Sequence, residues 1–365
     1  MSAAEEFFTT DLLGWYHSRP GRAMPWKKEK DAYKVWVSEI ILQQTRVVQG
    51  LNYYNRFIAN FPDIRSLATA AEDQLMQVWQ GLGYYSRARN MKIAANQLIE
   101  KFNGSFPETK EELLQLKGIG PYTAAAIASF AFSKPEPVVD GNVYRVLSRY
   151  FNDNHPIDHS NSYKHYLNRA KKLIEKKDPA SFNQAIMDLG AELCHPKNPT
   201  CDICPLLAHC RSNQMKNQDT LPFKSNKIKS RDRFFLFLFY VLDDEYCIIE
   251  KRVKKDIWEG LYQFPMIEME VFPAIFKQQD GNVISYLQEL LPETEPMAIK
   301  NISNVLTQKL THQNIFAIFV ETEIMQRPGR LANENQIIVP LQGLNNYAFP
   351  VLIKNWISKV LKYND

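Results

Sequence analysis

A single glutamate, Glu39, interrupts the apolar stretch "WVSEIIL" from Trp36 to Leu42. Burying a carboxylate costs free energy unless the group is paired or protonated, and a carboxylic acid that keeps its proton near neutral pH can act as a general acid. Taken alone, the pattern favours a structural explanation, in which Glu39 lies on a narrow exposed stripe or makes one hydrogen bond. Other groups must be found before Glu39 is assigned any chemistry.

Four of the five cysteines occur within 17 residues, with the spacing C-x6-C-x2-C-x5-C; they are Cys194, Cys201, Cys204 and Cys210. Disulfides are not expected in a cytosolic chain, whereas four closely spaced thiolates suit a metal. The spacing is equally compatible with zinc and with an iron–sulfur cluster. The fifth, Cys247, lies in an apolar stretch and is expected to be a small core residue.

A glycine-containing turn separates two helical stretches in "LLQLKGIGPYTAAAIASFAF", residues 113–132. Gly118 and Gly120 allow the backbone to turn sharply and to approach a ligand, and Pro121 suits the first position of a helix. Free amides at that helix start would face an anion such as a nucleic-acid phosphate. The pattern matches the helix-hairpin-helix motif of DNA repair proteins, although G-x-G alone is also typical of an ordinary helical hairpin.

A second carboxylate, Asp140, follows this hairpin in "PVVDGNVYRVL". An aspartate before glycine is commonly a turn residue or a helix cap. Its place after the hairpin makes it a candidate partner for Glu39.

The elements that must position these groups change in character along the chain. Up to about residue 210, short amphipathic or apolar segments predict helices, among them 31–47, 87–102 and 181–194. The polar stretch 212–231 indicates a linker. Beyond it, "RFFLFLFYVLDDEYCIIEKRV" and "NIFAIFVETEI" predict strands, and 282–291 and 351–363 predict helices. The second domain is therefore expected to be α+β.

Composition indicates a folded, soluble protein of two or three domains: the chain has 365 residues, of which 45% are hydrophobic. Residues 1–230 carry 30 Lys and Arg against 23 Asp and Glu, and residues 231–365 carry 14 against 17. The basic first part permits a polyanionic partner. We expect no signal peptide and no membrane association, because neither a basic n-region nor a long apolar run is present, and hence a cytoplasmic location.

The hairpin, Asp140 and the cysteine pattern, in this order, resemble the endonuclease III superfamily of DNA glycosylases, and the resemblance favours a 4Fe–4S cluster over zinc. Longer stretches narrow it to the MutY family of adenine DNA glycosylases; these are "MPW" (24–26), "YKVWVSEIILQQTRV" (33–47), "GLGYYSRARN" (81–90), "VVDGNVYRVL" (138–147), "FNQAIMDLGAELC" (182–194) and "IWEGLYQFP" (257–265). The similarity runs almost continuously over residues 10–210.

The resemblance implies a multidomain protein, with an all-α helix-hairpin-helix glycosylase domain that includes the 4Fe–4S module and an α+β, Nudix-like C-terminal domain. The expected boundaries are 1–211 for the helical region, 212–231 for the linker and 232–365 for the Nudix-like domain. Within the first, the hairpin module spans about 30–135 and the iron–sulfur module about 5–29 and 136–211. We expect a monomer.

The resemblance also implies the reaction, which is removal of adenine mispaired with 8-oxoguanine or guanine from duplex DNA. Glu39 matches the acid that protonates adenine, and Asp140 matches the carboxylate that stabilises the oxocarbenium-like sugar. Tyr122 and Asn142 match supporting positions. Because Tyr122 stands where lyases of the superfamily carry a lysine nucleophile, we expect base removal without strand cleavage.

Recognition residues carry over in the same way. Trp26 and Gln184 match the wall of the adenine pocket. Residues that match contacts to the lesion or to DNA are Gln44, Thr45, Leu82, Tyr84, Gly118, Gly120, Thr311 and His312. Tyr84 matches the aromatic side chain that wedges into the duplex. Arg87 and Arg89 are candidate phosphate contacts, with solvated helix charges as the alternative.

Departures from the family pattern affect the second domain most. Leu310–Thr311–His312 stands where relatives commonly have Phe-Ser-His, and Thr311 keeps a hydroxyl group. Residues 230–365 lack the G-x5-E-x7-R-E-x-x-E-E pattern, so this domain is expected to recognise the lesion and not to hydrolyse nucleotides. The alternatives are a bifunctional pyrimidine glycosylase/lyase, a non-catalytic iron–sulfur DNA-binding protein and a nucleotide pyrophosphatase.

Overall fold

The chain divides into two compact units in the computed structural model. Unit 1 comprises residues 1–70 and 89–227, and unit 2 comprises residues 71–88 and 228–365. The structure describes residues 3–19, 24–27, 29–45, 47–225, 230–272, 286, 297–324, 331 and 333–360. Among these residues, no helix combines the length and the apolar character needed to cross a lipid bilayer.

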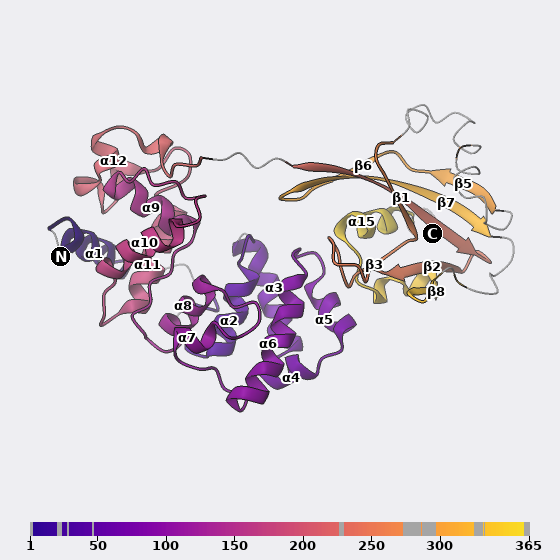
Figure 1. Ribbon diagram of the computed structural model, residues 1–365, viewed down its shortest axis with the longest axis horizontal. Coiled ribbons are helices and arrows are strands. Elements are labelled where there is room, and N and C mark those ends of the chain that lie inside the picture. Colours follow the sequence, from indigo (N-terminus) through magenta and orange to yellow (C-terminus); the bar gives the residue numbers. More distant parts are fainter. Residues whose placement is uncertain are drawn as a thin grey trace. The chain divides into compact units, whose positions relative to one another are not determined.

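Unit 1 is helical in all its described elements (Figure 1). Its longer helices are α1 (Ala3–His17), α2 (Ala32–Ile41), α3 (Val47–Asn60), α4 (Ile64–Thr69), α6 (Ser86–Phe102, of which residues 89 onward belong to unit 1), α8 (Pro121–Phe130), α9 (Gly141–Phe151), α10 (Ser162–Leu173) and α11 (Pro179–Glu192). The short ones are α7 (Lys110–Leu113), η1 (Cys201–Ile203), η2 (Leu207–His209), α12 (Arg211–Gln214) and η3 (Gln218–Thr220). The predicted helical character of this region is confirmed.

Helix α2 begins at a cap that the sequence specifies. The side chain of Asp31 accepts a hydrogen bond from the backbone amide of Lys34, which satisfies one of the free amides of the first turn. Almost every residue from Tyr33 to Ile41 is buried, and α2 packs against α8. The prediction of a helix up to residue 47 was wrong, because α2 ends at Ile41 and Gln44 adopts a left-handed conformation with φ of 58°.

The core of unit 1 on its C-terminal side joins α1 to α10, to α11 and to α9, which Asp140 caps. Phe8 and Leu12 of α1 are fully buried with apolar side chains of α9, α10 and α11. Phe8 meets Tyr150 edge to face, with ring centroids 4.8 Å apart. This packing fixes α9 against α11, so the first turn of α9 has a defined environment.

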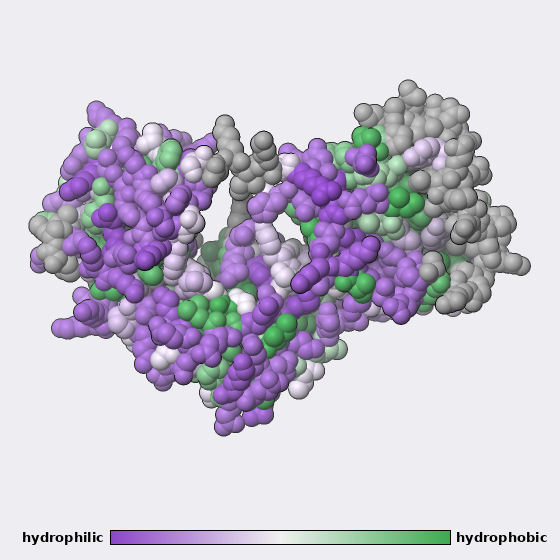
Figure 2. Space-filling model, viewed as in Figure 1, coloured by the Kyte–Doolittle hydropathy of each residue, from purple (hydrophilic) through white to green (hydrophobic). Residues whose placement is uncertain are grey.

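The hydrophilic surface of unit 1 is interrupted at the hairpin. On the face drawn in Figure 2, apolar side chains gather where α7 and α8 lie in Figure 1. Leu114, directly after α7, is 42% exposed. A group of apolar side chains on the surface, unlike a single one, suits contact with a partner.

Unit 2 is built on one mixed sheet (Figure 1). Its strands are β1 (Arg231–Leu242), β2 (Tyr246–Lys251), β3 (Tyr262–Gln263), β4 (Met266–Met269), β5 (Met297–Ile302), β6 (Leu306–Lys309), β7 (Gln313–Ile324) and β8 (Gln336–Pro340). The main order is β3-β2-β1-β7-β5, with β4 on β1, β6 on β7 and β8 on β2. Only β1 and β7 pair in parallel among these strands, and they do so from Arg231↔Gln313 to Leu242↔Ile324.

Helices complete unit 2, which confirms the predicted α+β character. They are α5 (Glu72–Trp79), η4 (Leu341–Asn346) and α15 (Val351–Val360). Trp356 of α15 stacks on Phe319 of β7, with centroids 4.4 Å apart. The predicted Asp-Asp turn is also confirmed: Asp243 and Asp244 both have φ above 50° and lie in the three-residue loop between the paired residues Leu242 and Tyr246.

Two further predictions concern the helix at residues 282–291 and the linker at residues 212–231. The helix predicted for residues 282–291 lies outside the described residues, apart from Tyr286, which is helical. Part of the polar stretch 212–231 is ordered on unit 1, where α12 and η3 lie and where the Arg149 Nε donates to the carbonyl oxygens of Gln218 (2.9 Å) and Leu221 (3.1 Å). The buried Cys247 confirms the prediction of a core residue.

Candidate functional site

Helices α2 and α8 bring a carboxyl group and a phenol together inside unit 1. The hydroxyl of Tyr122, in the first turn of α8, donates a 2.8 Å hydrogen bond to Oε2 of Glu39. Glu39 is 8% exposed, although it sits in the middle of α2. Burial raises the pKa of Glu39 to about 7; the hydrogen bond from Tyr122 lowers that pKa, and the charge of Asp140 raises it. Glu39 therefore carries a proton in much of the population near neutral pH.

Asp140 caps the helix that follows the hairpin. Its Oδ1 accepts from the backbone amide of Val143 (2.8 Å), and its Oδ2 accepts from Nδ2 of Asn142 (2.9 Å). Burial raises the pKa of Asp140, while these two hydrogen bonds and the charge of Arg145 act in the opposite direction. Glu39, Tyr122, Asp140 and Asn142, predicted to act in one site, are coupled in the structure: Tyr122 binds Glu39, Asn142 binds Asp140, and the charge of Asp140 acts on Glu39 and Tyr122.

Two residues that were not predicted from the sequence, Arg145 and Gly190, support Asp140. Arg145, one turn along α9, is 8% exposed and donates from Nη2 to Oδ1 of Asn142 (2.8 Å) and to the carbonyl oxygen of Gly190 (2.7 Å). Gly190 in α11 is needed for close packing, because a Cβ there would lie 2.6 Å from Cβ of Asn142 and 3.1 Å from its Cα. Spacing gives a weak signal for Arg145, which lies three residues after Asn142 on the same helix face.

The two hairpin glycines have different roles. Gly118 has φ of 78°, and a Cβ there would lie 2.6 Å from Cβ of Asn90, so both conformation and space require glycine. Gly120 precedes α8 with φ of −89°, and a Cβ there would meet no heavy atom within 4 Å. The open space beside Gly120 lies at the start of α8, where backbone amides lack partners within the helix.

The residues that follow α2 form a turn beside the hairpin helix. The amide of Thr45 donates to the carbonyl oxygen of Leu42 (3.2 Å), across the left-handed Gln44. Nε2 of Gln43 donates to Oγ1 of Thr123 (3.3 Å), which ties this turn to α8. Gln44 and Thr45 therefore occupy a turn next to the helix of Glu39.

Trp26 and Gln184 are predicted to share a pocket wall, and one carboxylate links Gln184 to Lys27, the residue after Trp26. Asp188 accepts from Nε2 of Gln184 (3.0 Å) and from Nζ of Lys27 (2.7 Å). Trp26 precedes Lys27 and packs edge to face on Tyr54, with centroids 5.2 Å apart. The segment 24–27 and α11 are thereby held close to each other.

The four clustered cysteines line one cavity of unit 1, together with Arg149, Leu193, Pro199, Thr200, Leu207, Asn213 and Gln218. Nη1 of Arg149 lies 3.4 Å from Sγ of Cys194, and its other contacts are carbonyl oxygens. Arg149 is 2% exposed. Among the described residues, no three Cys, His, Asp or Glu side chains converge tightly enough to hold a single metal ion. The four thiols therefore line a common cavity and are not gathered around a single position.

Unit 2 contains the other predicted recognition residues except Arg89, which lies half-buried in the unit 1 part of α6. Tyr84 is 45% exposed with φ of 48°, and its hydroxyl group is hydrogen-bonded to Oγ1 of Thr311. The carbonyl oxygen of the exposed His312 accepts from the amide of Arg231 (3.0 Å). Tyr84, Thr311 and His312 therefore lie in one region of unit 2.

Arg87 and Leu82 shape the loop that presents Tyr84. Nη2 of Arg87 donates to the carbonyl oxygen of Gly83 at 3.2 Å, and its guanidinium lies 5.3 Å from the ring centroid of Trp79. Burial lowers the pKa of Arg87 to about 10. Leu82 is 7% exposed. In this conformation the guanidinium of Arg87 stabilises the loop through its contacts with Gly83 and Trp79.

Sequence comparisons identify relatives over nearly the whole chain. The family model for HhH-GPD superfamily base excision DNA repair proteins matches residues 37–176. The chain is 36% identical to the adenine DNA glycosylase of Buchnera aphidicola subsp. Baizongia pistaciae, over 98% of this chain and 97% of that protein. It is 41% identical to the adenine DNA glycosylase of Rattus norvegicus, over 59% of this chain and 43% of that protein.

Two solved structures match somewhat more than half of the chain. A thermostable thymine-DNA glycosylase is 26% identical, with a TM-score of 0.54, over 58% of this chain and 97% of that structure. A non-covalent endonuclease III–DNA complex is 22% identical, with a TM-score of 0.51, over 59% of this chain and 99% of that structure. The second likeness shows the fold alone.

Proposed function

Since the chain belongs to the adenine DNA glycosylase family of helix-hairpin-helix base excision repair proteins, we propose that it excises adenine mispaired with 8-oxoguanine or guanine from duplex DNA. Glu39 is the general acid, and Asp140 stabilises the oxocarbenium-like sugar. Tyr122 and Asn142 position and tune these two carboxyl groups.

The burial of Glu39 in the middle of α2, with its hydrogen bond from Tyr122, is the observation that carries this proposal. An acid that protonates a leaving base must hold its proton at the working pH, and burial gives Glu39 a pKa of about 7. Tyr122, whose own pKa is raised well above its usual value by burial, stays a neutral donor and fixes the carboxyl group. An ordinary surface glutamate would be ionised at pH 7.

The reaction follows from the two carboxyl environments. Adenine leaves the duplex stack and enters unit 1, because a stacked base cannot reach a buried acid. Glu39 transfers its proton to N7 of adenine, and the glycosidic bond then breaks with its electrons going to the base. Asp140, which accepts two hydrogen bonds, places negative charge near the cationic sugar. Water then adds to the sugar and leaves an abasic site.

Tyr122 also limits the chemistry to base removal. A Schiff base with the sugar requires an amine, and the phenol of Tyr122 cannot form one. Its hydroxyl group is already directed at Glu39. The enzyme is therefore monofunctional and leaves the DNA backbone intact.

Recognition of the mispair involves both units. Trp26 and Gln184 form part of the adenine pocket in unit 1, and Gln44 and Thr45 lie on the turn after the helix of Glu39. Gly118 and Gly120 hold a DNA phosphate at the start of α8. In unit 2, Leu82, Tyr84, Thr311 and His312 contact the oxidised guanine. The Tyr84–Thr311 hydrogen bond supports a role for both in one recognition surface.

A 4Fe–4S cluster is proposed for the cysteine-lined cavity. Cys194, Cys201, Cys204 and Cys210 would hold it, because four thiols around a common volume fit the four iron corners of such a cluster. The buried, permanently charged Arg149 beside Cys194 suits an anionic thiolate site. When bound, the cluster would order residues 194–210 without taking part in base removal.

Unit 2 is proposed to be a Nudix-like domain that reads the lesion and does not hydrolyse nucleotides. Its mixed sheet with a parallel β1–β7 pair supports this, and residues 230–365 lack the acidic hydrolase pattern. We further propose a monomer that acts on double-stranded DNA in the cytoplasm, with domain boundaries at 1–211, 212–231 and 232–365.

The deciding experiment uses labelled duplexes that contain A:8-oxoguanine, A:G, A:T or thymine glycol, each analysed with and without alkali. Strand breaks that need alkali and occur only with the first two duplexes are expected. Breaks without alkali would instead indicate a lyase. Absence of adenine release from A:8-oxoguanine would overturn the proposal.

A further inference from the structure

A basic loop tip projects from unit 2 between Arg252 and Gly260. Its residues Val253, Lys254 and Lys255 are exposed, and Val253 is 60% exposed. Neither lysine makes a side-chain hydrogen bond or ion pair with the described residues. Two adjacent, uncompensated ammonium groups beside an exposed apolar side chain form a surface that favours an anion.

The base of this loop is held rigidly. The amide of Gly260 donates to the carbonyl oxygen of Arg252 (2.7 Å), and the amide of Arg252 donates to that of Leu261 (2.9 Å). Nε of Arg252 donates to the carbonyl oxygen of Ile257 (3.1 Å), which closes the loop from inside. Because these contacts exist in the free protein, ordering the tip costs little conformational entropy when a ligand binds.

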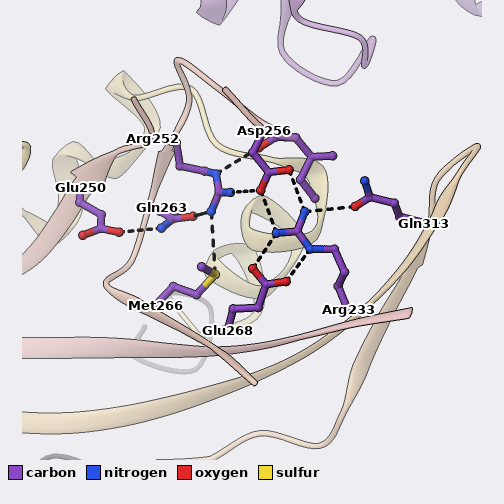
Figure 3. A network of polar contacts seen from close by, with 9 residues as sticks. Arg233, Glu250, Arg252, Asp256, Gln263, Met266, Glu268 and Gln313 are labelled. Atoms are coloured by element: carbon purple, nitrogen blue, oxygen red, sulfur yellow. Dashed lines mark hydrogen bonds and ion pairs between the residues drawn. The ribbon is translucent and has the colours of Figure 1, made fainter. Parts of the chain in front are cut away.

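Two carboxylates beside the tip, Asp256 and Glu268, are paired with arginines (Figure 3). Asp256 accepts from Nη1 and Nη2 of Arg233, each at 2.8 Å, and from Nη2 of Arg252 at 2.9 Å. Glu268 accepts from Nε and Nη2 of Arg233, each at 2.7 Å. Two guanidinium groups thus balance these two carboxylates, and neither carboxylate pairs with Lys254 or Lys255.

The ion-pair hub formed by Arg233, Arg252, Asp256 and Glu268 also connects the tip to the turn of unit 2 that carries Thr311 and His312. Nη1 of Arg233 also donates to Oε1 of Gln313 (3.2 Å), the residue after His312 (Figure 3). The guanidinium of Arg233 therefore contacts both Asp256, next to Lys255, and Gln313, next to His312. The tip and the turn lie at the same end of the sheet, where the exposed Arg231 adds positive charge.

We propose that Val253, Lys254 and Lys255 form a DNA-backbone contact of unit 2, which binds phosphodiester groups close to the nucleotide read by Thr311 and His312. The proposal rests on the proposed function, because it requires duplex DNA as the partner. The contact is electrostatic and independent of sequence, so it adds affinity and orientation and does not discriminate between lesions.

The test measures the salt dependence of binding to a duplex that carries a tetrahydrofuran abasic analogue opposite 8-oxoguanine, which cannot be excised. Each lost phosphate contact lowers the slope of log K against log salt by about 0.9 in magnitude. The K254Q/K255Q variant should therefore lower it by nearly 2, with a similar decrease for an undamaged duplex. Both side chains are exposed, so the unfolding midpoint should not change.

The control is K300Q, which removes one positive charge from the opposite end of β1. Lys300 pairs with Asp244 (3.0 Å) and Glu323 (3.3 Å), and Asp244 lies just past the end of that strand. K300Q should keep the wild-type slope. An unchanged slope in K254Q/K255Q, or an equal decrease per lysine in K300Q, would overturn the proposal. Adenine release by the wild-type enzyme tests the proposed function separately, because either result can occur without the other.

Discussion

The hydroxyl of Tyr122 donates to the carboxyl group of Glu39 across 2.8 Å, and 83 residues of sequence separate the two. The hydrogen bond lowers the pKa of Glu39 against the larger effect of burial. The acid is thereby held with a pKa near 7, where it can both keep a proton and give it up.

Replacing Glu39 by Gln should abolish adenine release while lesion binding is retained. The amide has nearly the same shape but carries no transferable proton, and loss of general acid catalysis typically costs about 10²- to 10⁴-fold in rate. Single-turnover excision from an A:8-oxoguanine duplex measures the rate, and anisotropy with an abasic-analogue duplex measures binding. Normal turnover by E39Q would refute the acid role.

The single-turnover rate should fall as the pH rises above about 7, because Glu39 then loses its proton. Stability should change as well, since the pKa of Glu39 is raised in the folded state. Between pH 4.5 and 7 only the folded state holds this proton, so rising pH lowers the free energy of unfolding, by about 3 kcal/mol at most. Denaturant unfolding of wild type and E39Q across this range isolates the effect, and parallel curves would contradict it.

Replacing Tyr122 by Phe should move the alkaline limb of the pH–rate profile to higher pH. The variant removes the hydrogen bond that lowers the pKa of Glu39 and leaves the burial that raises it. Tyr163→Phe is the matched control, because the buried hydroxyl of Tyr163 has no hydrogen-bond partner in the described structure. A limb that stays in place in Y122F, or moves equally in Y163F, would contradict the assignment.

Replacing Gly190 by Ala should lower both excision and stability. The new Cβ would lie 2.6 Å from Cβ of Asn142, so α11 must move away from the residues that hold Asp140. Overpacking of this kind costs about 1–3 kcal/mol. Gly14→Ala, in α1, is the control, since a Cβ there meets nothing within 4 Å and alanine favours a helix. Chemical unfolding and single-turnover rates should separate the two variants.

Purified protein should contain about four irons and four sulfides per chain if the cysteine cavity holds the proposed cluster. Cys201→Ser should lower the iron content and the unfolding midpoint, because it removes one of the four thiolates that would hold the cluster and so weakens the cross-link between residues 194 and 210. Cys247→Ala is the control: this thiol is buried in β2, away from the cavity, and iron should remain. Elemental analysis that finds zinc in place of iron would overturn the cluster assignment.

Much of the site follows from local patterns. An apolar helix with one carboxylate, a glycine turn and an aspartate before a helix place Glu39, Tyr122 and Asp140 in one hypothesis. The role of Arg145 could not be predicted from the sequence. An arginine in a helix is usually exposed to solvent, and the burial of this one follows from the close packing of α11 against α9 at Gly190. The end of α2 was also misplaced, since Gln44 adopts its left-handed conformation without the glycine or asparagine that usually signals one.

The ion-pair hub of unit 2 lay beyond sequence reasoning for another reason. Arg233, Asp256, Glu268 and Gln313 are spread over 81 residues, and no periodic pattern connects them. Their proximity depends on the sheet order, in which β4 and β7 both pair with β1. Charges that look like separate surface groups along the chain become one cluster only after the strands assemble.

The parallel pairing of β1 with β7 has a consequence for how unit 2 forms during synthesis. The centre of the sheet cannot close until residues 313–324 have left the ribosome, although β1 is complete at residue 242. In that interval the strand "FFLFLFYVL" lacks its central partner, and such an unpaired apolar strand is prone to aggregation. A premature stop between β1 and β7 would therefore leave β1 without its parallel partner in an aggregation-prone remnant, whereas α1 to α11 would already be complete.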